Sequence, residues 1–109
     1  MKIGAWDIGG KVVKKDERYT VKDNTYLTKL VLSSTDLNPG HSTTGHSHIG
    51  QEEVYMFIEG RGEMQLDDDR FEVYPGDTVL IPGGVFHRVF NTSTGQLRFN
   101  CVFDGARGE

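Results

Sequence analysis

The fold is decided by residues 53–84, which read EVYMFIEGRGEMQLDDDRFEVYPGDTVLIPGG. Short runs rich in β-branched and aromatic residues alternate there with clusters of Gly, Pro and Asp. Gly tolerates positive φ, Pro fixes φ and Asp bonds to its own backbone, so each cluster predicts a turn. Turns spaced about 8 to 12 residues apart are typical of all-β sandwiches and barrels, and no helix of three turns fits between them.

The same alternation continues on both sides of this stretch, so the sequence predicts an all-β fold. In the last expected strand, Leu97, Phe99, Cys101 and Phe103 share one face and polar residues occupy the other, which indicates a half-buried strand. Asp67–Asp69 is interpreted as a solvated hairpin turn, because it lacks the spaced oxygens of a calcium loop. The expected strands are Tyr26–Ser33, Gly45–Ile49, Glu53–Glu59, Glu63–Leu66, Arg70–Val73, Thr78–Ile81, His87–Asn91 and Gln96–Phe103.

The length of 109 residues predicts one domain, residues 1–109. A net charge of −4 repels phosphate backbones and anionic lipid heads, so neither nucleic acid nor a membrane surface is expected as a partner. Apolar runs are far shorter than the roughly 20 residues that span a bilayer. The single cysteine, Cys101, and first residues without an apolar signal region predict a cytoplasmic location.

Charge is distributed unevenly along the chain. Residues 1–29 carry all six lysines and a net charge of +3, whereas the remaining residues contain no lysine and carry a net charge of −7. We interpret residues 1–25 as a peripheral N-terminal strand segment rather than a separate domain. The acidic remainder favours a neutral or singly charged metabolite over a heavily phosphorylated one.

Four side chains suited to metal ligation stand out, namely His46, His48, Glu53 and His87. Residues two apart on a strand project to the same face, so His46 and His48 can converge on one ion. Glu53 can return on the next strand after the turn at Ile49–Gln51, and His87 opens another strand. Three imidazoles and one carboxylate leave up to two positions of an octahedral ion open, as a catalytic site requires.

These residues lie in two motifs at fixed spacings, and together the motifs resemble those of the cupin superfamily. The resemblance covers residues 40–91, and the short segment between the motifs is similar to that of small microbial single-domain cupins. The motifs are Gly40-x5-His46-x-His48-x4-Glu53-x6-Gly60 and Gly76-x5-Pro82-x-Gly84-x2-His87-x3-Asn91.

The resemblance implies a cupin jelly roll, a double-stranded β-helix with a metal site inside the barrel. The first motif also selects between the adjacent carboxylates Glu52 and Glu53, because it requires a glycine seven residues after the ligand. Gly60 lies seven residues after Glu53, whereas Glu59 lies seven residues after Glu52. We therefore expect Glu53 to be the ligand, and His41 to lie outside the site. We expect the ion to be one divalent transition metal, and Mn, Fe, Ni, Zn and Cu are all compatible with these ligands.

Two enzymatic hypotheses use this metal site differently. In the first, the ion acts as a Lewis acid on a sugar, sugar phosphate or keto acid, and Tyr55 moves a proton in an isomerase or epimerase. Small cupins that resemble this chain include metal-dependent sugar-phosphate isomerases, and Arg98 and Asn100 would suit a polar ligand in the pocket. In the second, a redox ion supports a dioxygenase whose pocket is lined by Phe57 and Phe86.

Two further possibilities stay open. In one, the protein is a non-catalytic module that binds or senses a small ligand. In the other, the metal serves only the stability of the fold. In every case the expected partner is a small molecule. A homodimer is also expected, because a jelly roll of this size leaves strand edges that the N-terminal segment or a second copy must cover.

Overall fold

The computed structural model describes residues 1–105, and these residues form nine β-strands and no helix. The expected all-β class is confirmed, and no helix in this part of the chain could cross a membrane. The strands are β1 (Lys11–Lys15), β2 (Tyr19–Asn24), β3 (Leu30–Leu37), β4 (Glu53–Glu59), β5 (Gly62–Leu66), β6 (Asp69–Val73), β7 (Thr78–Ile81), β8 (His87–Phe90) and β9 (Leu97–Asp104).

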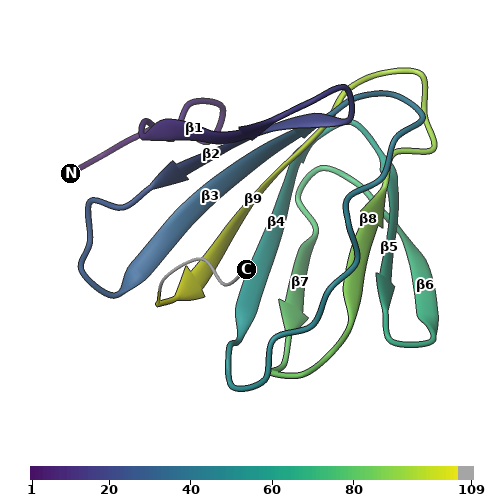
Figure 1. Cartoon of the computed structure of the whole chain (residues 1–109). Coiled ribbons are helices and arrows are strands. Elements are labelled where there is room, and N and C mark those ends of the chain that lie inside the picture. Colours follow the sequence, from purple (N-terminus) through teal and green to yellow (C-terminus); the bar gives the residue numbers. More distant parts are fainter. Residues whose placement is uncertain (106–109) are drawn as a thin grey trace.

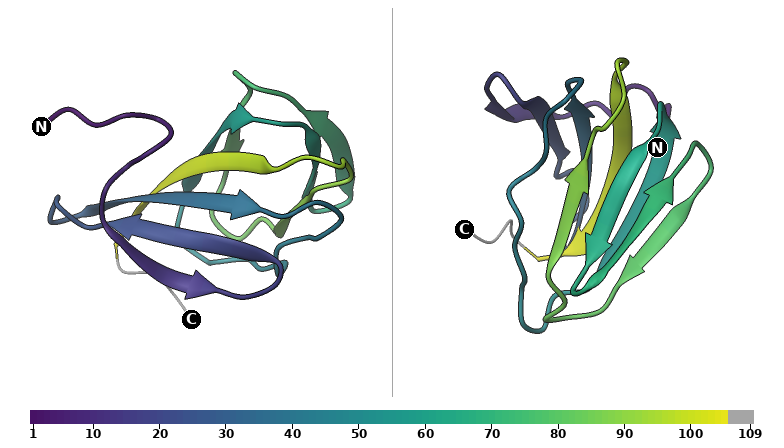
Figure 2. Two further views of the ribbon diagram at one scale, coloured as in Figure 1. Left: turned by 90° about the horizontal axis from the view of Figure 1, so that it is seen from above. Right: turned by 90° about the vertical axis from the view of Figure 1, so that its right-hand side faces the viewer.

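The strands form two antiparallel sheets that enclose a jelly-roll barrel (Figure 1). The large sheet has the order β1-β2-β3-β9-β4-β7, and the small sheet has the order β6-β5-β8. Figure 2 shows the two sheets from two further directions, with the hairpin of β1 and β2 extending beyond the barrel. Strands distant in sequence are neighbours, since β3 pairs with β9 and β9 with β4.

The interior of the barrel is packed at one end and polar at the other. Leu37, Phe57, Met64 and Leu97 are almost completely buried and fill the packed end. Burial of each such side chain stabilises the fold by roughly 1.5–3 kcal/mol. The same strand faces then carry buried polar groups towards the other end, where Glu53 begins β4. The packed end therefore provides a rigid base for a polar site.

Gly60 allows β4 to end close to the start of β9. Its φ is +80°, and a Cβ at this position would lie 2.0 Å from the carbonyl oxygen of Gln96. A side chain would therefore meet both an unfavourable backbone conformation and a clash with the backbone. This glycine explains the tight reversal between β4 and β5, at the last position of the first motif.

The connection between β3 and β4, residues 38–52, runs beside β8 instead of forming a regular strand. Only an isolated bridge joins His46 to His87, so the expected strand Gly45–Ile49 is wrong. Regular backbone pairing between this connection and β8 is interrupted by a side chain, because the Thr43 hydroxyl accepts the hydrogen bond from the backbone N–H of Val89.

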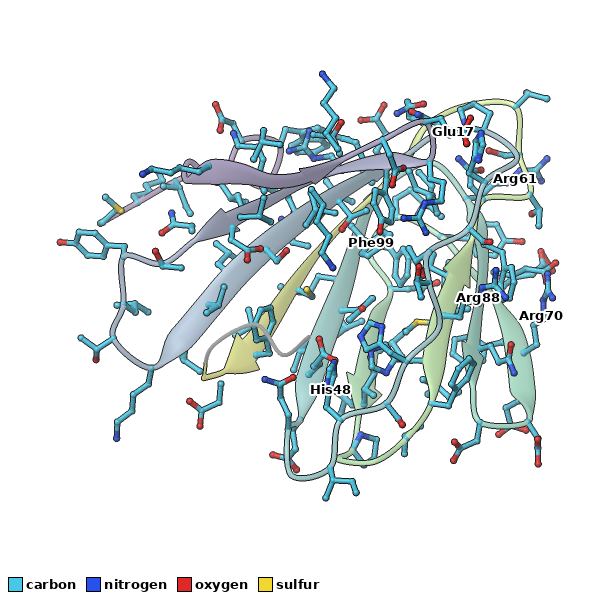
Figure 3. All side chains as sticks on the ribbon, viewed as in Figure 1. Glu17, His48, Arg61, Arg70, Arg88 and Phe99 are labelled. Carbon is cyan, nitrogen blue, oxygen red and sulfur yellow. The ribbon has the colours of Figure 1, made fainter. Side chains whose placement is uncertain are left out.

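Arg88 of β8 fixes the same connection from the outer face of the small sheet (Figure 3). Its Nε donates to the Thr43 carbonyl at 2.8 Å, and its Nη2 donates to the Ser42 hydroxyl at 2.9 Å. The guanidinium groups of Arg70 and Arg88 both lie over the Phe90 ring, 3.8 and 5.0 Å from its centroid. These contacts hold residues 42 and 43 against β8 and so place the residues that follow them.

The N-terminal region differs from the expectation of a single peripheral strand. Residues 11–24 form the two-stranded hairpin β1–β2, and β2 pairs along its whole length with β3. The expected strand Tyr26–Ser33 is displaced to Leu30–Leu37. The Asn24 side chain accepts a bond from the backbone N–H of Tyr26 and starts a turn there, and β2 and β9 on either side stabilise the polar end of β3.

Candidate metal centre

Three side chains from distant parts of the chain meet at the polar end of the barrel. The candidate ligand atoms of His46, Glu53 and His87 all lie within 4.8 Å of one another. Glu53 is the first residue of β4 and His87 the first of β8, while His46 is held opposite His87 by the isolated bridge. Glu53 is buried and Glu52 is exposed, which agrees with the choice of Glu53 from the sequence.

The contact between Glu53 and His87 has the distance of a hydrogen bond but not its geometry. Glu53 Oε2 and His87 Nε2 are 2.9 Å apart, yet both are buried and neither has a hydrogen-bond partner among the described residues. Two buried polar atoms without such partners are costly unless a third group satisfies both. A cation held between them would do so, and the donor set therefore fits a divalent transition metal.

Backbone carbonyls orient the two imidazole rings of this cluster. The carbonyl of Val85 lies 3.1 Å from His87 Nδ1, and the carbonyl of Thr44 lies 3.2 Å from His46 Nδ1. A carbonyl can only accept, so each Nδ1 carries the proton and donates it. The lone pair of each Nε2 then remains available for a metal, which is the arrangement of metal-ligating histidines.

Electrostatics keeps two of these ligands deprotonated. Burial, followed by the proximity of His87, lowers the pKa of His46 below its ordinary value. For Glu53, burial acts to raise the pKa, but the contact with His87 and the nearby imidazoles together outweigh it and leave the pKa lowered. A neutral imidazole and an ionised carboxylate are the forms that bind metals.

His48, the fourth expected ligand, lies beside the cluster but is not one of its three close members. Its ring centroid is 4.7 Å from that of His46, and it belongs to the loop that precedes β4 (Figure 3). Its backbone carbonyl accepts a bond of 2.8 Å from Gly84, which ties this loop to the turn before β8. His41 does not belong to the cluster among the described residues.

The cluster opens into a cavity of about 550 Å³, and a smaller pocket of about 80 Å³ continues towards the core. His46 and Glu53 line both spaces, while His48 lines the outer one. Hydroxyl side chains form much of the inner wall, from Ser33, Thr35, Thr43, Thr44 and Tyr55. The inner pocket therefore has a hydroxyl-rich wall, and Phe99 and Cys101 add apolar surface to it.

The expected catalytic residue, Tyr55, reaches this pocket. Its ring stacks on Phe99 with 5.2 Å between centroids and meets His87 edge-on at 5.7 Å. The two expected aromatic lining residues do not line either space. Phe57 is buried in the packed end of the barrel, and the Phe86 ring lies against Gly45, where it occupies the space that a Cβ would need.

Arg98 and Asn100 are not brought to the cavity, so the structure corrects their expected place in the pocket. On β9 they alternate with Phe99 and Cys101, which face inwards, and therefore lie on the outer face of the large sheet. Arg98 is 3.5 Å from Asp36, and Asn100 donates to the Ala5 carbonyl at 3.0 Å. The N-terminal segment covers this face, which the sequence did not reveal.

Sequence reasoning missed cationic residues at the mouth of the cavity. Lys14, Lys15 and Arg18 of the β1–β2 hairpin line the outer space together with His46 and His48. The concentration of lysines in residues 1–29 was the available signal, but no pattern in the sequence indicates that this segment folds back beside the site. Arg18 also bonds to the Thr44 hydroxyl at 2.8 Å, linking the hairpin to the loop that carries His46.

Comparison with known proteins shows several relatives. An uncharacterised protein of Methanocaldococcus jannaschii is 32% identical, with 84% of this chain and 85% of that protein aligned. An oxalate-binding protein of Thermotoga maritima is 26% identical over 86% of this chain and 78% of its own. A glucose-6-phosphate isomerase of Thermococcus litoralis is 30% identical over 84% of this chain, which spans only 55% of that enzyme.

Solved structures show the same fold at low identity. A polyketide cyclase of Streptomyces resistomycificus superposes with a TM-score of 0.80 at 24% identity, covering 100% of this chain and 82% of that one. The family model of the cupin domain matches residues 33–103, which include both motifs and the three clustered ligands. By this match and by the archaeal relative, the chain belongs to the cupin family.

Proposed function

We propose that this cupin binds one divalent transition metal through His46, His48, Glu53 and His87 and acts on a small oxygen-rich metabolite. The observation that carries the proposal is the buried contact of Glu53 Oε2 with His87 Nε2, two metal-ligand atoms at 2.9 Å without hydrogen-bond partners among the described residues. His48 completes the set from beside His46. The donor set is compatible with Mn, Fe, Ni, Zn or Cu.

The proposed reaction is an isomerisation or epimerisation of a sugar, sugar phosphate or keto acid. A bound divalent metal supplies Lewis acidity that polarises a carbonyl oxygen. The chain's own residues orient the substrate through the hydroxyls of Thr35 and Thr43, which line the inner pocket. Tyr55 holds or moves a proton at its hydroxyl, from a ring fixed between Phe99 and His87.

The hydroxyl groups in the wall of the inner pocket favour this chemistry over a dioxygenase. An apolar aromatic lining by Phe57 and Phe86 was the sequence feature in support of oxygen chemistry, and neither residue lines the cavity. Two relatives point in the same direction, because oxalate and glucose 6-phosphate, which appear in their names, are both oxygen-rich small molecules.

The name of the oxalate-binding relative also supports a second candidate, a metal-dependent binding module without catalysis. One experiment separates the candidates: metal analysis of protein purified without oxygen, followed by sugar-isomer and oxygen-uptake assays with Mn²⁺ or Fe²⁺ restored. Isomer exchange without oxygen supports the isomerase, and oxygen uptake coupled to substrate loss contradicts it. Ligand binding with neither activity supports the binding module. The cytoplasmic location and the homodimer remain part of the proposal.

A further inference from the structure

We propose that the β1–β2 hairpin forms an oxyanion-binding subsite in which Lys14 holds a carboxylate or phosphate group of the metabolite. This inference deepens the proposed function and rests on it, because the rest of the metabolite would face His46 and Glu53 in the same cavity. It narrows the expectation from charge alone, which favoured a neutral or singly charged ligand, to a ligand with an anionic group.

The fold delivers positive charge to the mouth of an otherwise acidic barrel. All six lysines lie in residues 1–29, and the rest of the chain carries a net charge of −7. The hairpin β1–β2 brings two of these lysines, Lys14 and Lys15, to the rim of the cavity of about 550 Å³ that contains His46 and His48. Local cations at the entrance of a cleft attract anions even when the whole protein is negative.

The register of the hairpin directs Lys14 inwards. Lys14 pairs with Val21, whose side chain faces the barrel interior and lines the inner pocket, so Lys14 shares that face. In a regular strand, side chains alternate between the two faces, so Val13 would share the inward face with Lys11. A shift in register between Val12 and Lys14 changes this alternation and puts Lys14 on the inward face instead. Such bulges redirect side chains beside functional sites. Lys14 accordingly lines both the outer cavity and the inner pocket, which contains Glu53.

Lys14 is available to a ligand, whereas the neighbouring arginine is not. Arg18 forms an ion pair with Asp16 at 2.8 Å and donates hydrogen bonds to the hydroxyls of Thr44 and Tyr19. The ion pair also neutralises Asp16, the hairpin carboxylate that lines the outer cavity. No carboxylate of residues 1–105 forms an ion pair with Lys14 or Lys15. Lys14, which reaches deeper than Lys15, is therefore the cation left to pair with an anion.

The geometry selects a small ligand with an anionic end and an oxygen-rich end. The anionic end pairs with Lys14 at the hairpin, while carbonyl or hydroxyl oxygens face His46 and Glu53 across the same space. The hydroxyls of Thr35 and Thr44 line the inner pocket and can donate a hydrogen bond to either a carboxylate or a phosphate.

Calorimetric titration of the Mn²⁺-loaded protein with oxalate and with inorganic phosphate tests the subsite, with both anions tested separately. Lys14→Met retains the aliphatic stem and removes the charge. Lys11→Met is the matched control, because Lys11 is on the same strand and lines a different surface hollow. We expect Lys14→Met to weaken anion binding about threefold to fivefold, as for removal of one exposed charge partner, and Lys11→Met to change it less than twofold.

The loss of affinity caused by Lys14→Met identifies the ligand class, since a larger loss for oxalate indicates a carboxylate and a larger loss for phosphate indicates a phosphate group. The inference is overturned if Lys14→Met binds both anions as the wild type does, if Lys11→Met weakens binding equally, or if the wild type binds neither. Mn²⁺ affinity is measured for each protein and should not differ among them. Repeating the phosphate titration on metal-free protein separates the two proposals, because Lys14-dependent binding there upholds the subsite even if metal uptake fails.

Discussion

His46 and His87 face each other across an isolated antiparallel bridge, with backbone hydrogen bonds of 3.2 and 2.9 Å and ring centroids 4.3 Å apart. The bridge joins the two motifs through the main chain. The backbone therefore holds both imidazoles in place before any ion binds. Metal binding then loses little conformational entropy, because the loop that carries His46 is already ordered.

Replacing His48 by alanine should lower metal affinity at least tenfold, because loss of a ligand costs at least as much as the 10- to 100-fold typical of the groups that orient ligands. His41→Ala is the control and should leave the affinity nearly unchanged, since His41 lies outside the cluster. Competition against a coloured chelator measures both variants. Equal metal occupancy of the two would remove His48 from the site.

Removing the metal with a chelator should lower the melting temperature. An ion that binds only the folded state adds about 2.7 kcal/mol when its free concentration is 100 times Kd, which for a domain of this size is worth roughly 10 °C or more. Glu53→Gln keeps the shape of the side chain but loses the charge, and its melting temperature should respond little to added metal. Melting curves with and without metal measure this, and an undiminished shift in Glu53→Gln would argue against Glu53 as a ligand.

Asp16 should titrate far below an ordinary carboxyl group. The side-chain and backbone hydrogen bonds from Arg18 lower the pKa of Asp16 from 3.8 to about 2. Because the folded-state pKa is depressed, the stabilisation is present above the unfolded value and is lost as the pH falls through about 2. Carboxyl carbon chemical shifts measured against pH give the midpoint. A midpoint near 3.8 would show that the Arg18 contacts do not persist in solution.

Gly60→Ala should destabilise the protein by more than about 1–3 kcal/mol, the usual cost of a non-glycine residue in an unfavourable backbone conformation. The added Cβ would also meet the Gln96 carbonyl at 2.0 Å. Gly95→Ala is the matched control, because nothing lies within 4 Å of a Cβ there and its φ is not positive. Urea unfolding compares the two, and similar stabilities would contradict the packing described for the end of β4.

The protein should sediment as a homodimer at micromolar concentration. One reason is that β1 and β7 are the unpaired edges of the large sheet in the described part of the chain. A second is an apolar hollow of about 280 Å³ on the outer face of this sheet, which includes the exposed side chains of Tyr26, Leu27 and Leu30. Leu30→Glu would place a charge in this hollow and should shift the equilibrium towards monomer if this face forms the contact. A monomeric wild type would refute the dimer.

Local sequence was sufficient for strands β4 to β9 but not for the region that precedes β4. The bounds of β4 and β7 match the expected ranges, because strong turn formers flank hydrophobic runs at both places. The polar run from Ser33 to Asp36 was expected to end a strand, yet it lies in the middle of β3, since pairing with β2 and β9 stabilises it. Propensity cannot reveal partners that are distant in sequence.

By itself the sequence determined the fold class, the family and the identity of the candidate metal ligands, because these depend on periodicity, turn chemistry and fixed spacing between residues close in the chain. Only the tertiary structure decided what surrounds those ligands. It placed Arg98 and Asn100 on the outer face of the large sheet, put Phe57 in the core and brought Lys14 to the cavity. The face that a side chain occupies depends on strand register and on bulges, which pairing across the sheet sets and which no local pattern in the chain encodes.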